Sequence, residues 1–197
     1  MAATYDRSTA LLVVDMQNDF ADPAGSLYVA GGEHVVDFVN QEQQWASDSG
    51  AVIVYTQDWH PATTPHFAKD GGVWPVHCVA GTWGAELHPR LHLFPGADVV
   101  RKGTSGEDGY SAFSVREPTT GDQAGTGLDD LLRARGVTRV VIVGLATDYC
   151  VKETGLDARR LGFDATVVTD AIAAVDLQPG DGERALEVVR AAGVTLA

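Results

Sequence analysis

The sequence predicts an α/β fold: a doubly wound, mostly parallel six-stranded sheet with helices on both faces. Short runs of β-branched and apolar residues alternate with helical patterns along the whole chain, and repeated β–α units of this kind form parallel sheets with right-handed crossovers. Several strand segments are apolar nearly throughout, which is typical of strands that are covered on both faces. Glycine recurs just past the helical segments, where a left-handed cap favours it.

The predicted elements follow one another in a regular order. The strands are residues 10–14, 51–56, 98–101, 139–143, 165–168 and 194–196. The helices are residues 33–47, 127–135, 151–161 and 181–192. Residues 59–95, which are rich in Pro, His and Trp, break this pattern, and residues 102–127 are rich in Gly, Ser, Thr and Asp. We predict loops for both stretches and expect the first to carry function, because long irregular connections in compact domains usually do.

Size and charge limit the kinds of partner. The 197 residues suffice for a proper core, so we expect a single domain over residues 1–197. A net charge of −13 argues against nucleic acid or an anionic membrane, because both bind clustered Lys and Arg. Two cysteines are too few for a disulfide framework, and residues 1–8 lack the apolar core of a signal peptide. We therefore predict a cytoplasmic protein with reduced thiols; a homo-oligomer is compatible with these features.

Reactive side chains follow four of the predicted strands. Asp15, Asp58 and Lys102 come at the ends of the first three, and a short segment after the fourth leads to Cys150. Ligands of open parallel sheets bind outside the carboxyl ends of the strands. We therefore expect these four side chains to meet at one edge of the sheet.

Cys150 lies just before a predicted helix. The unpaired N–H groups of a helix start, together with a nearby Lys102, lower the pKa of a thiol. The same N–H groups can hold an oxyanion. The alternative is that Cys150 is a small buried residue and that Asp15 and Lys102 form a structural ion pair. Hydrolysis of an amide, however, needs a proton acceptor for the thiol and a proton donor for the leaving group, and one carboxylate can serve both. We favour a thiolate nucleophile that acts on a small amide.

A second group of residues has the composition of a metal site. Asp58, His60, His66 and His77 lie in or beside the irregular stretch, and in an extended chain Asp58 and His60 point to the same side. One carboxylate and three imidazoles suit Zn, Fe or Mn better than Ca or Mg, and Zn is the ion we expect. The alternative is that these are solvated loop histidines. The remaining histidines, which lack such neighbours, are predicted to lie on the surface: His34, His88 and His92.

At this point the residues resemble a known family, the nicotinamidase/pyrazinamidase branch of the isochorismatase-like cysteine hydrolases. The matching segments are VVDMQNDF (13–20), TQDWH (56–60), WPVHC (74–78), RKG (101–103) and GLATDYCV (144–151). Each is weak alone, but together they run in family order over nearly the whole chain. The loops at 104–109 and 115–127 do not align residue by residue, so the resemblance says least about substrate range.

The resemblance implies a role for each site residue. It implies a triad of Asp15, Lys102 and Cys150 and a metal held by Asp58, His60 and His77, with His66 as a further ligand. It implies that Phe20 and Trp74 line the aromatic ring of the substrate with Tyr110 nearby, although ordinary core packing is the alternative for these aromatic residues. The backbone N–H groups of Ala146 and Cys150 correspond to the oxyanion hole, and the family commonly has a cis peptide at the position of Leu145–Ala146.

The implied activity is conversion of nicotinamide to nicotinate and ammonia, and of pyrazinamide to pyrazinoate, in the salvage of NAD. One alternative is another amidohydrolase of the same fold that acts on a small amide, carbamoyl or ureido compound; the metal cluster favours a pyridine-type substrate over these. Another is a metal-binding or redox module in which Cys78 and Cys150 pair reversibly, which leaves Asp15 and Lys102 unexplained.

Overall fold

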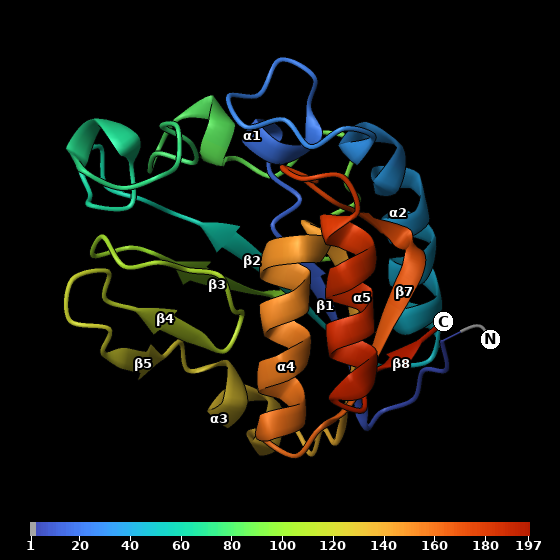
Figure 1. Ribbon diagram of the computed structural model, residues 1–197. Helices are drawn as coiled ribbons and strands as arrows, with labels where there is room; N and C mark the ends of the chain where they lie inside the picture. Colours follow the sequence, from blue (N-terminus) through green and yellow to red (C-terminus); the bar gives the residue numbers. More distant parts are fainter. Residues whose placement is uncertain (1–2) are drawn as a thin grey trace.

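A six-stranded sheet forms the centre of the molecule. The structure, a computed structural model, describes residues 3–197; residues 1 and 2 of the expected domain lie outside the described residues. The strand order is β3-β2-β1-β6-β7-β8, and every neighbouring pair is parallel (Figure 1). The strands are β1 (Thr9–Val14), β2 (Val52–Asp58), β3 (Asp98–Lys102), β6 (Arg139–Leu145), β7 (Asp164–Ala173) and β8 (Thr195–Leu196). Each of the six predicted strands is present; five keep their bounds to within two residues, whereas β7 continues five residues past its predicted end at Val168.

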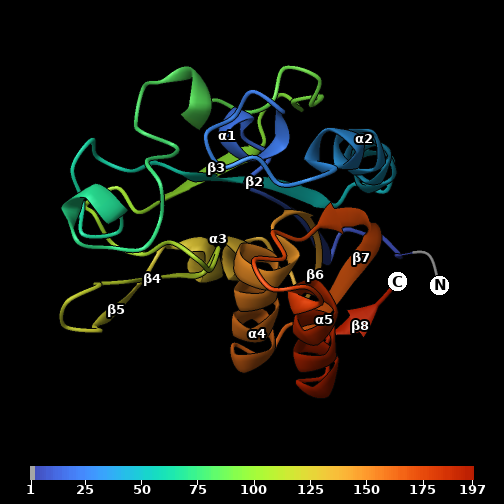
Figure 2. The same cartoon turned by 45° about the horizontal axis from the view of Figure 1, so that its top comes forward.

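Helices cover both faces of this sheet, as predicted. Figure 2 shows α1 (Asn18–Ala21) and α2 (Gly32–Asp48) on one side of the sheet. On the other side lie α3 (Leu128–Ala134), α4 (Lys152–Arg160) and α5 (Asp181–Ala191). Of these, only α1 lacks a sequence prediction, because it is too short to have a period. The doubly wound α/β prediction is therefore confirmed.

The central strand explains why the apolar runs are continuous. All six residues of β1 are buried, although successive side chains of a strand point to opposite faces. Leu11 and Val13 belong to the core under α2, where Val36 is one of their partners. Leu12 and Val14 belong to the second core, on the side of α3 and α4. A strand with a core on each face has no polar face, which is why helix–strand alternation and not residue alternation predicts this sheet.

The prediction of a structureless loop over residues 102–127 is wrong in part. This stretch contains an antiparallel hairpin, β4 (Ser114–Arg116) and β5 (Gln123–Gly125), separate from the main sheet. Its strands are short and mainly exposed, so they carry no apolar alternation that a sequence pattern could reveal. The other irregular stretch has only two short 3₁₀ turns, η1 (Ala68–Asp70) and η2 (Trp83–Ala85).

The strand order creates a crevice between β1 and β6. From β1 the chain moves outward through β2 to β3, and then returns to the other side of β1 as β6. The carboxyl ends of the two central strands are therefore followed by segments that diverge. Gly144 lets β6 approach β1 closely here, because a Cβ atom on it would lie 2.1 Å from the carbonyl oxygen of Val14.

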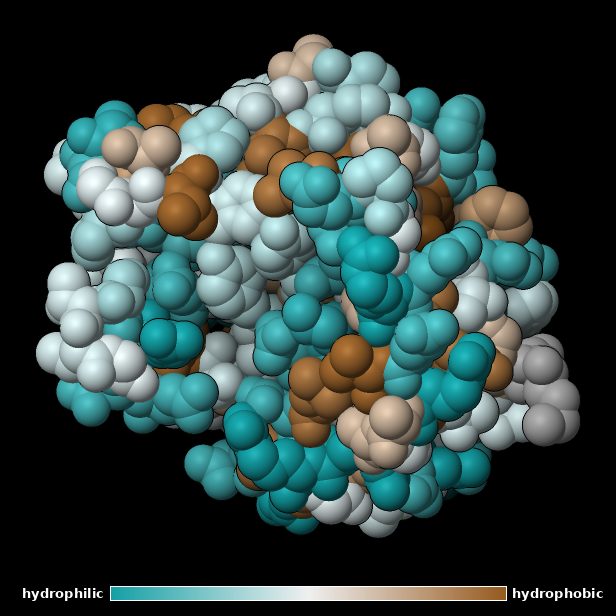
Figure 3. All heavy atoms as spheres, in the orientation of Figure 1, coloured by the Kyte–Doolittle hydropathy of each residue, from teal (hydrophilic) through white to brown (hydrophobic). Residues whose placement is uncertain are grey.

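The outer surface is mainly hydrophilic on the face that carries α4 and α5, with a small apolar patch over these helices (Figure 3). Val188 of α5 is 48% exposed and is one of few large apolar side chains that reach solvent in this region. Among the described residues, no helix is both long and apolar enough to cross a membrane.

Candidate active site and metal centre

The predicted triad meets beyond the carboxyl ends of the central strands. The ammonium group of Lys102, at the end of β3, donates to Asp15 Oδ2 at 2.7 Å and lies 3.7 Å from Cys150 Sγ. It also donates to Asp58 Oδ1 at 2.8 Å and to the carbonyl oxygen of Gly109. The side chains of Asp15 and Lys102 are fully buried. One cation therefore links the two carboxylates and the thiol.

Electrostatics explain why Lys102 stays charged without contact with water. Burial lowers the pKa of its amine, but the carboxylates of Asp15 and Asp58 outweigh burial and hold the pKa well above its ordinary value. Burial also raises the pKa of Asp15, against the opposing effect of Lys102. A carboxylate with a raised pKa is a stronger base than an ordinary aspartate, which suits it to accept a thiol proton.

The expected lowering of the Cys150 pKa is wrong. Burial raises the pKa of this thiol well above its ordinary value, and the carboxylates of Asp15 and Asp58 add to that effect against Lys102. The helix end and Lys102 both lower the pKa of the thiol, but burial and two nearby anions outweigh them. A thiol whose pKa is raised needs a base that takes its proton before the sulfur can attack.

Two polar side chains set the positions of the carboxylates. Asp15 has φ of 49°, and Thr56 Oγ1 donates to its Oδ1 at 2.5 Å and accepts its backbone N–H at 3.1 Å. Gln17 accepts the backbone N–H of Asp58 at 2.8 Å and donates to its carbonyl oxygen at 2.7 Å. Its amide thus acts as a strand partner for Asp58 where β1 has already ended. Sequence analysis gave neither Thr56 nor Gln17 a role, because their partners are distant in the chain.

The three predicted histidine ligands face one point. One ring nitrogen of each of His60, His66 and His77 lies within 4.8 Å of the others, and all three side chains are buried. Asp58 Oδ2 lies 3.7 Å from His60 Nε2 and 3.9 Å from His77 Nε2. The structure therefore brings the four expected ligands together, and the reading of solvated loop histidines is wrong.

The donor atoms are in the chemical state that a divalent transition metal requires. Neither ring nitrogen of His60 forms a hydrogen bond with a described residue, although both are buried. His77 Nδ1 lies 2.8 Å from the carbonyl oxygen of Pro75, which can only accept, so Nε2 keeps its lone pair. Burial lowers the pKa of His77 to about 4. Buried polar atoms without partners are costly, and a metal ion of this ligand preference satisfies them.

Asp108 supports the same centre and was not predicted. Its Oδ1 lies 2.6 Å from His66 Nδ1, so it orients the ring and leaves Nε2 for a metal. For Asp58, burial raises the pKa, but Lys102 and the imidazole of His60 outweigh it and hold the pKa well below its usual range. Asp58 is thus an ionised carboxylate that lies beside the imidazoles of His60 and His77 and also bonds Lys102.

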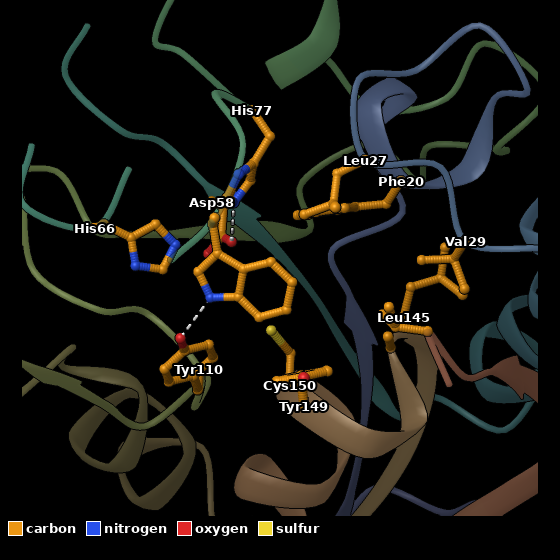
Figure 4. Close-up of a pocket in the computed structure, with 13 residues that line it drawn as sticks. Phe20, Leu27, Val29, Asp58, His66, His77, Tyr110, Leu145, Tyr149 and Cys150 are labelled. Carbon is orange, nitrogen blue, oxygen red and sulfur yellow. Dashed lines mark hydrogen bonds and ion pairs between the residues drawn. The ribbon is translucent and has the colours of Figure 1, made fainter. Parts of the chain in front are cut away.

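The two centres open into one cavity. Its lining includes the three aromatic residues predicted to contact substrate, Phe20, Trp74 and Tyr110, together with Ala146 and Cys150. In Figure 4, His66, His77 and Asp58 lie on one side, Cys150 extends its sulfur into the cavity, and Phe20 lies on the apolar side. Trp74 Nε1 donates to the hydroxyl of Tyr110 at 2.7 Å. Five further residues line the cavity and were not predicted to do so, namely Leu27, Val29, Leu145, Tyr149 and Val175.

The segment that carries Cys150 is a tight turn at the start of α4. The Leu145–Ala146 peptide is cis, as the resemblance implied. It leads into one turn of π-helix, η3 (Thr147–Val151), which continues as α4. The continuous helical segment therefore begins about one turn earlier than predicted, and Cys150 lies within its first turn. The sulfur of Cys150 faces the cavity, and Ala146 also lines it.

One of the three histidines predicted to be exposed is not. His34 and His92 are exposed, but His88 is 5% exposed and its Nε2 lies 3.9 Å from Asp22 Oδ2. Its backbone N–H pairs with the carbonyl oxygen of Met16, which draws it under the loop after β1. Cys78 and Cys150 are both buried free thiols.

Known proteins have the same fold and similar sequences. The family model described as Isochorismatase domain matches residues 9–197. A nicotinamidase of Escherichia coli is 41% identical over 203 residues, 95% of this chain and 93% of that protein. A pyrazinamidase of Pyrococcus horikoshii, solved in complex with zinc, has a TM-score of 0.87 and 40% identity over 96% of this chain and 98% of its own. A protein of L. infantum, solved in complex with nicotinate, has a TM-score of 0.88 and 39% identity over 100% of this chain and 96% of its own. The chain belongs to the isochorismatase family.

Proposed function

We propose that this protein is a nicotinamidase, a metal-assisted cysteine amidohydrolase that converts nicotinamide to nicotinate and ammonia and also accepts pyrazinamide. The observation that carries the proposal is the shared cavity: the thiol of Cys150 faces it from one side, and His66 and His77 face it from another. Such a cavity can hold a flat ring by a nitrogen and present a carboxamide to the sulfur. The nicotinamidase and pyrazinamidase relatives support this substrate class.

Asp15 moves the proton in both halves of the reaction. It takes the proton of Cys150 while Sγ attacks the carboxamide carbon, and the electron pair of the C=O bond moves to the oxygen. The backbone N–H groups of Ala146 and Cys150 hold that oxyanion. Asp15 then gives the proton to the amide nitrogen, the C–N bond breaks, ammonia leaves and a thioester remains. Asp15 next takes a proton from water, which attacks the thioester; the C–S bond breaks, and the thiol regains its proton.

Asp58, His60, His66 and His77 are the ligands we assign to the metal. We expect Zn, with Fe or Mn as alternatives, because the pyrazinamidase of Pyrococcus horikoshii was solved in complex with zinc. When bound there, the ion would supply Lewis acidity toward the lone pair of a pyridine-type nitrogen. Phe20 and Trp74 cover the faces of the ring, and Tyr110 holds Trp74 in place through its hydroxyl. Cys78 and Cys150 are both free thiols, and thiols stay reduced in the cytosol, so we place the reaction in the cytoplasm.

The proposal is tested by ammonia release from nicotinamide, pyrazinamide and benzamide. Benzamide has the same shape as nicotinamide but lacks the ring nitrogen, so we expect rapid release from the first two and at least a tenfold lower kcat/KM for benzamide. Cys150→Ala should abolish release from all three while circular dichroism stays unchanged. Ammonia release by the folded Cys150→Ala variant, or equal rates for nicotinamide and benzamide, contradicts the proposal.

A further inference from the structure

Asp19 is a buried carboxylate next to the cavity that belongs to neither centre. It is 7% exposed, and its side chain accepts two backbone N–H groups from different loops. Oδ2 accepts from Cys78 at 2.7 Å, and Oδ1 accepts from Ser26 at 3.0 Å. Its own carbonyl oxygen accepts the N–H of Leu27 at 3.1 Å. One residue thus joins α1, the loop that follows it and the loop between β2 and β3.

In each of these three segments, a residue directly adjacent to the bonded one lies in the cavity wall. Phe20 follows Asp19, Leu27 follows Ser26, and His77 precedes Cys78; all three line the cavity. The carboxylate therefore sets the distance between a proposed metal ligand and two apolar residues that face the substrate. Phe20 and His77 are in contact across this junction, with ring centroids 5.4 Å apart.

The surroundings of Asp19 are adapted to its carboxylate. Cys78 has φ of 45°, which is unfavourable for a residue with a side chain and is held by the bond to Asp19. Gly84 leaves the necessary room, because a Cβ atom there would lie 2.0 Å from Asp19 Oδ2. A strained residue and an obligatory glycine on the same side chain indicate that its position matters.

We propose that Asp19 is a positioning residue, which holds His77 in register with the other metal ligands and Phe20 and Leu27 in register with the substrate ring. Its effect on catalysis rests on the proposed function; the contacts do not. Two oxygens are required because the two N–H donors approach different oxygens. In Asp19→Asn the amide has one acceptor, and its NH₂ group faces the second N–H donor.

The test compares Asp19→Asn with Asp22→Asn. Asp22 lies three positions further on and is partly exposed, and its side chain accepts the N–H of Ala24 at 2.8 Å, which an asparagine does equally well. Its other neighbour is His88, 3.9 Å away, which does not line the cavity. We expect the Kd for zinc of metal-free Asp19→Asn, measured by chelator competition, to rise roughly 10- to 100-fold. The KM for nicotinamide should rise with it, and kcat should fall less. Asp22→Asn should match the wild type in all three.

Hydrogen exchange separates this inference from the proposed function. In Asp19→Asn the amides of Ser26 and Cys78 should exchange at least tenfold faster, while those of β1 keep wild-type rates. This result supports the contacts even if the wild type releases no ammonia, which is the failure of the proposed function. Unchanged exchange together with wild-type zinc affinity overturns the inference. A lower Tm with unchanged zinc affinity and KM also overturns it, because the role is then merely structural.

A second variant reaches the same carboxylate if Asp19→Asn does not fold. Gly84→Ala keeps Asp19 but pushes its carboxylate away from Cys78. We expect the same direction of change in zinc affinity and KM, with a smaller size. Wild-type values for a folded Gly84→Ala variant overturn the inference.

Discussion

At the scale of single residues, the site depends on how few charges serve many purposes. Lys102 is the only described cation that bonds both Asp15 and Asp58, so the buried group keeps an excess of negative charge beside Cys150. That excess adds to burial in raising the pKa of the thiol, and in the proposed mechanism Asp15 is the base that takes the proton during attack. A buried ion pair of this kind is weak evidence for stability. The proposed proton transfer is a better reason for the presence of Lys102 and the two carboxylates.

Thr56 gives a test of how Asp15 is oriented. Thr56→Val is isosteric but loses the hydroxyl that donates to Asp15 Oδ1, and a hydrogen bond to a charged group contributes about 1.5–3 kcal/mol. We expect kcat to fall about 10- to 100-fold, with little change in KM because Thr56 does not line the cavity. Steady-state kinetics measure this. Thr56→Ser, which keeps the hydroxyl, should recover most of the activity; equal losses in both variants mean that packing and not orientation is responsible.

At the scale of elements, η3 is joined to the loop after β7 by Asp148. Its two carboxylate oxygens accept the N–H groups of Val175 and Asp176, each at 2.9 Å. Val175 is one of the residues that line the cavity. The turn that carries Cys150 therefore also fixes a wall of the substrate site, although the two segments come from different β–α units.

Asp148→Asn should loosen that wall, because an amide has only one acceptor for two N–H donors. Loss of one charge-assisted bond corresponds to about 1.5–3 kcal/mol, or a fall in Tm of roughly 3–12 °C for a chain of this size. We expect KM for nicotinamide to rise several-fold. Calorimetry and kinetics measure the two effects. The control is Asp181→Asn, since Asp181 makes comparable bonds to Gln178 and Arg184 outside the cavity; an equal rise in KM there refutes the argument.

At the scale of the whole molecule, the proposed metal ligands come from the end of β2 and from the long loop before β3, so a bound ion would tie these two segments together. Ligands that bind only the folded state stabilise it, by about 2.7 kcal/mol at 100 times Kd. We expect chelator to lower the Tm by roughly 5–10 °C and added zinc to restore it. His60→Ala removes a ligand whose ring nitrogens have no other described partner, so its Tm should no longer respond to zinc. A Tm of the wild type that is insensitive to chelator excludes a tightly held structural role for the ion.

The fold and the reactive atoms could be predicted because the signals for them are local. A strand between two cores must be apolar, a helix must be periodic, and the residue that ends a parallel strand must lie at the ligand-binding edge. Asp15, Asp58, Lys102 and Cys150 were predicted from their positions alone. The hairpin β4–β5 was not, since an exposed pair of short strands imposes no pattern on its residues.

The supporting contacts needed the folded chain. Asp19 and Cys78 are 59 positions apart, and Gln17 and Asp58 are 41 apart. The sequence around a polar residue does not show which distant group it bonds. The roles of Thr56, Asp108 and Asp148 therefore could not be predicted either. The shift of the Cys150 pKa was predicted in the wrong direction for the same reason. Charge in a buried site depends on every neighbour in three dimensions, whereas strand and helix depend chiefly on the nearest residues along the chain.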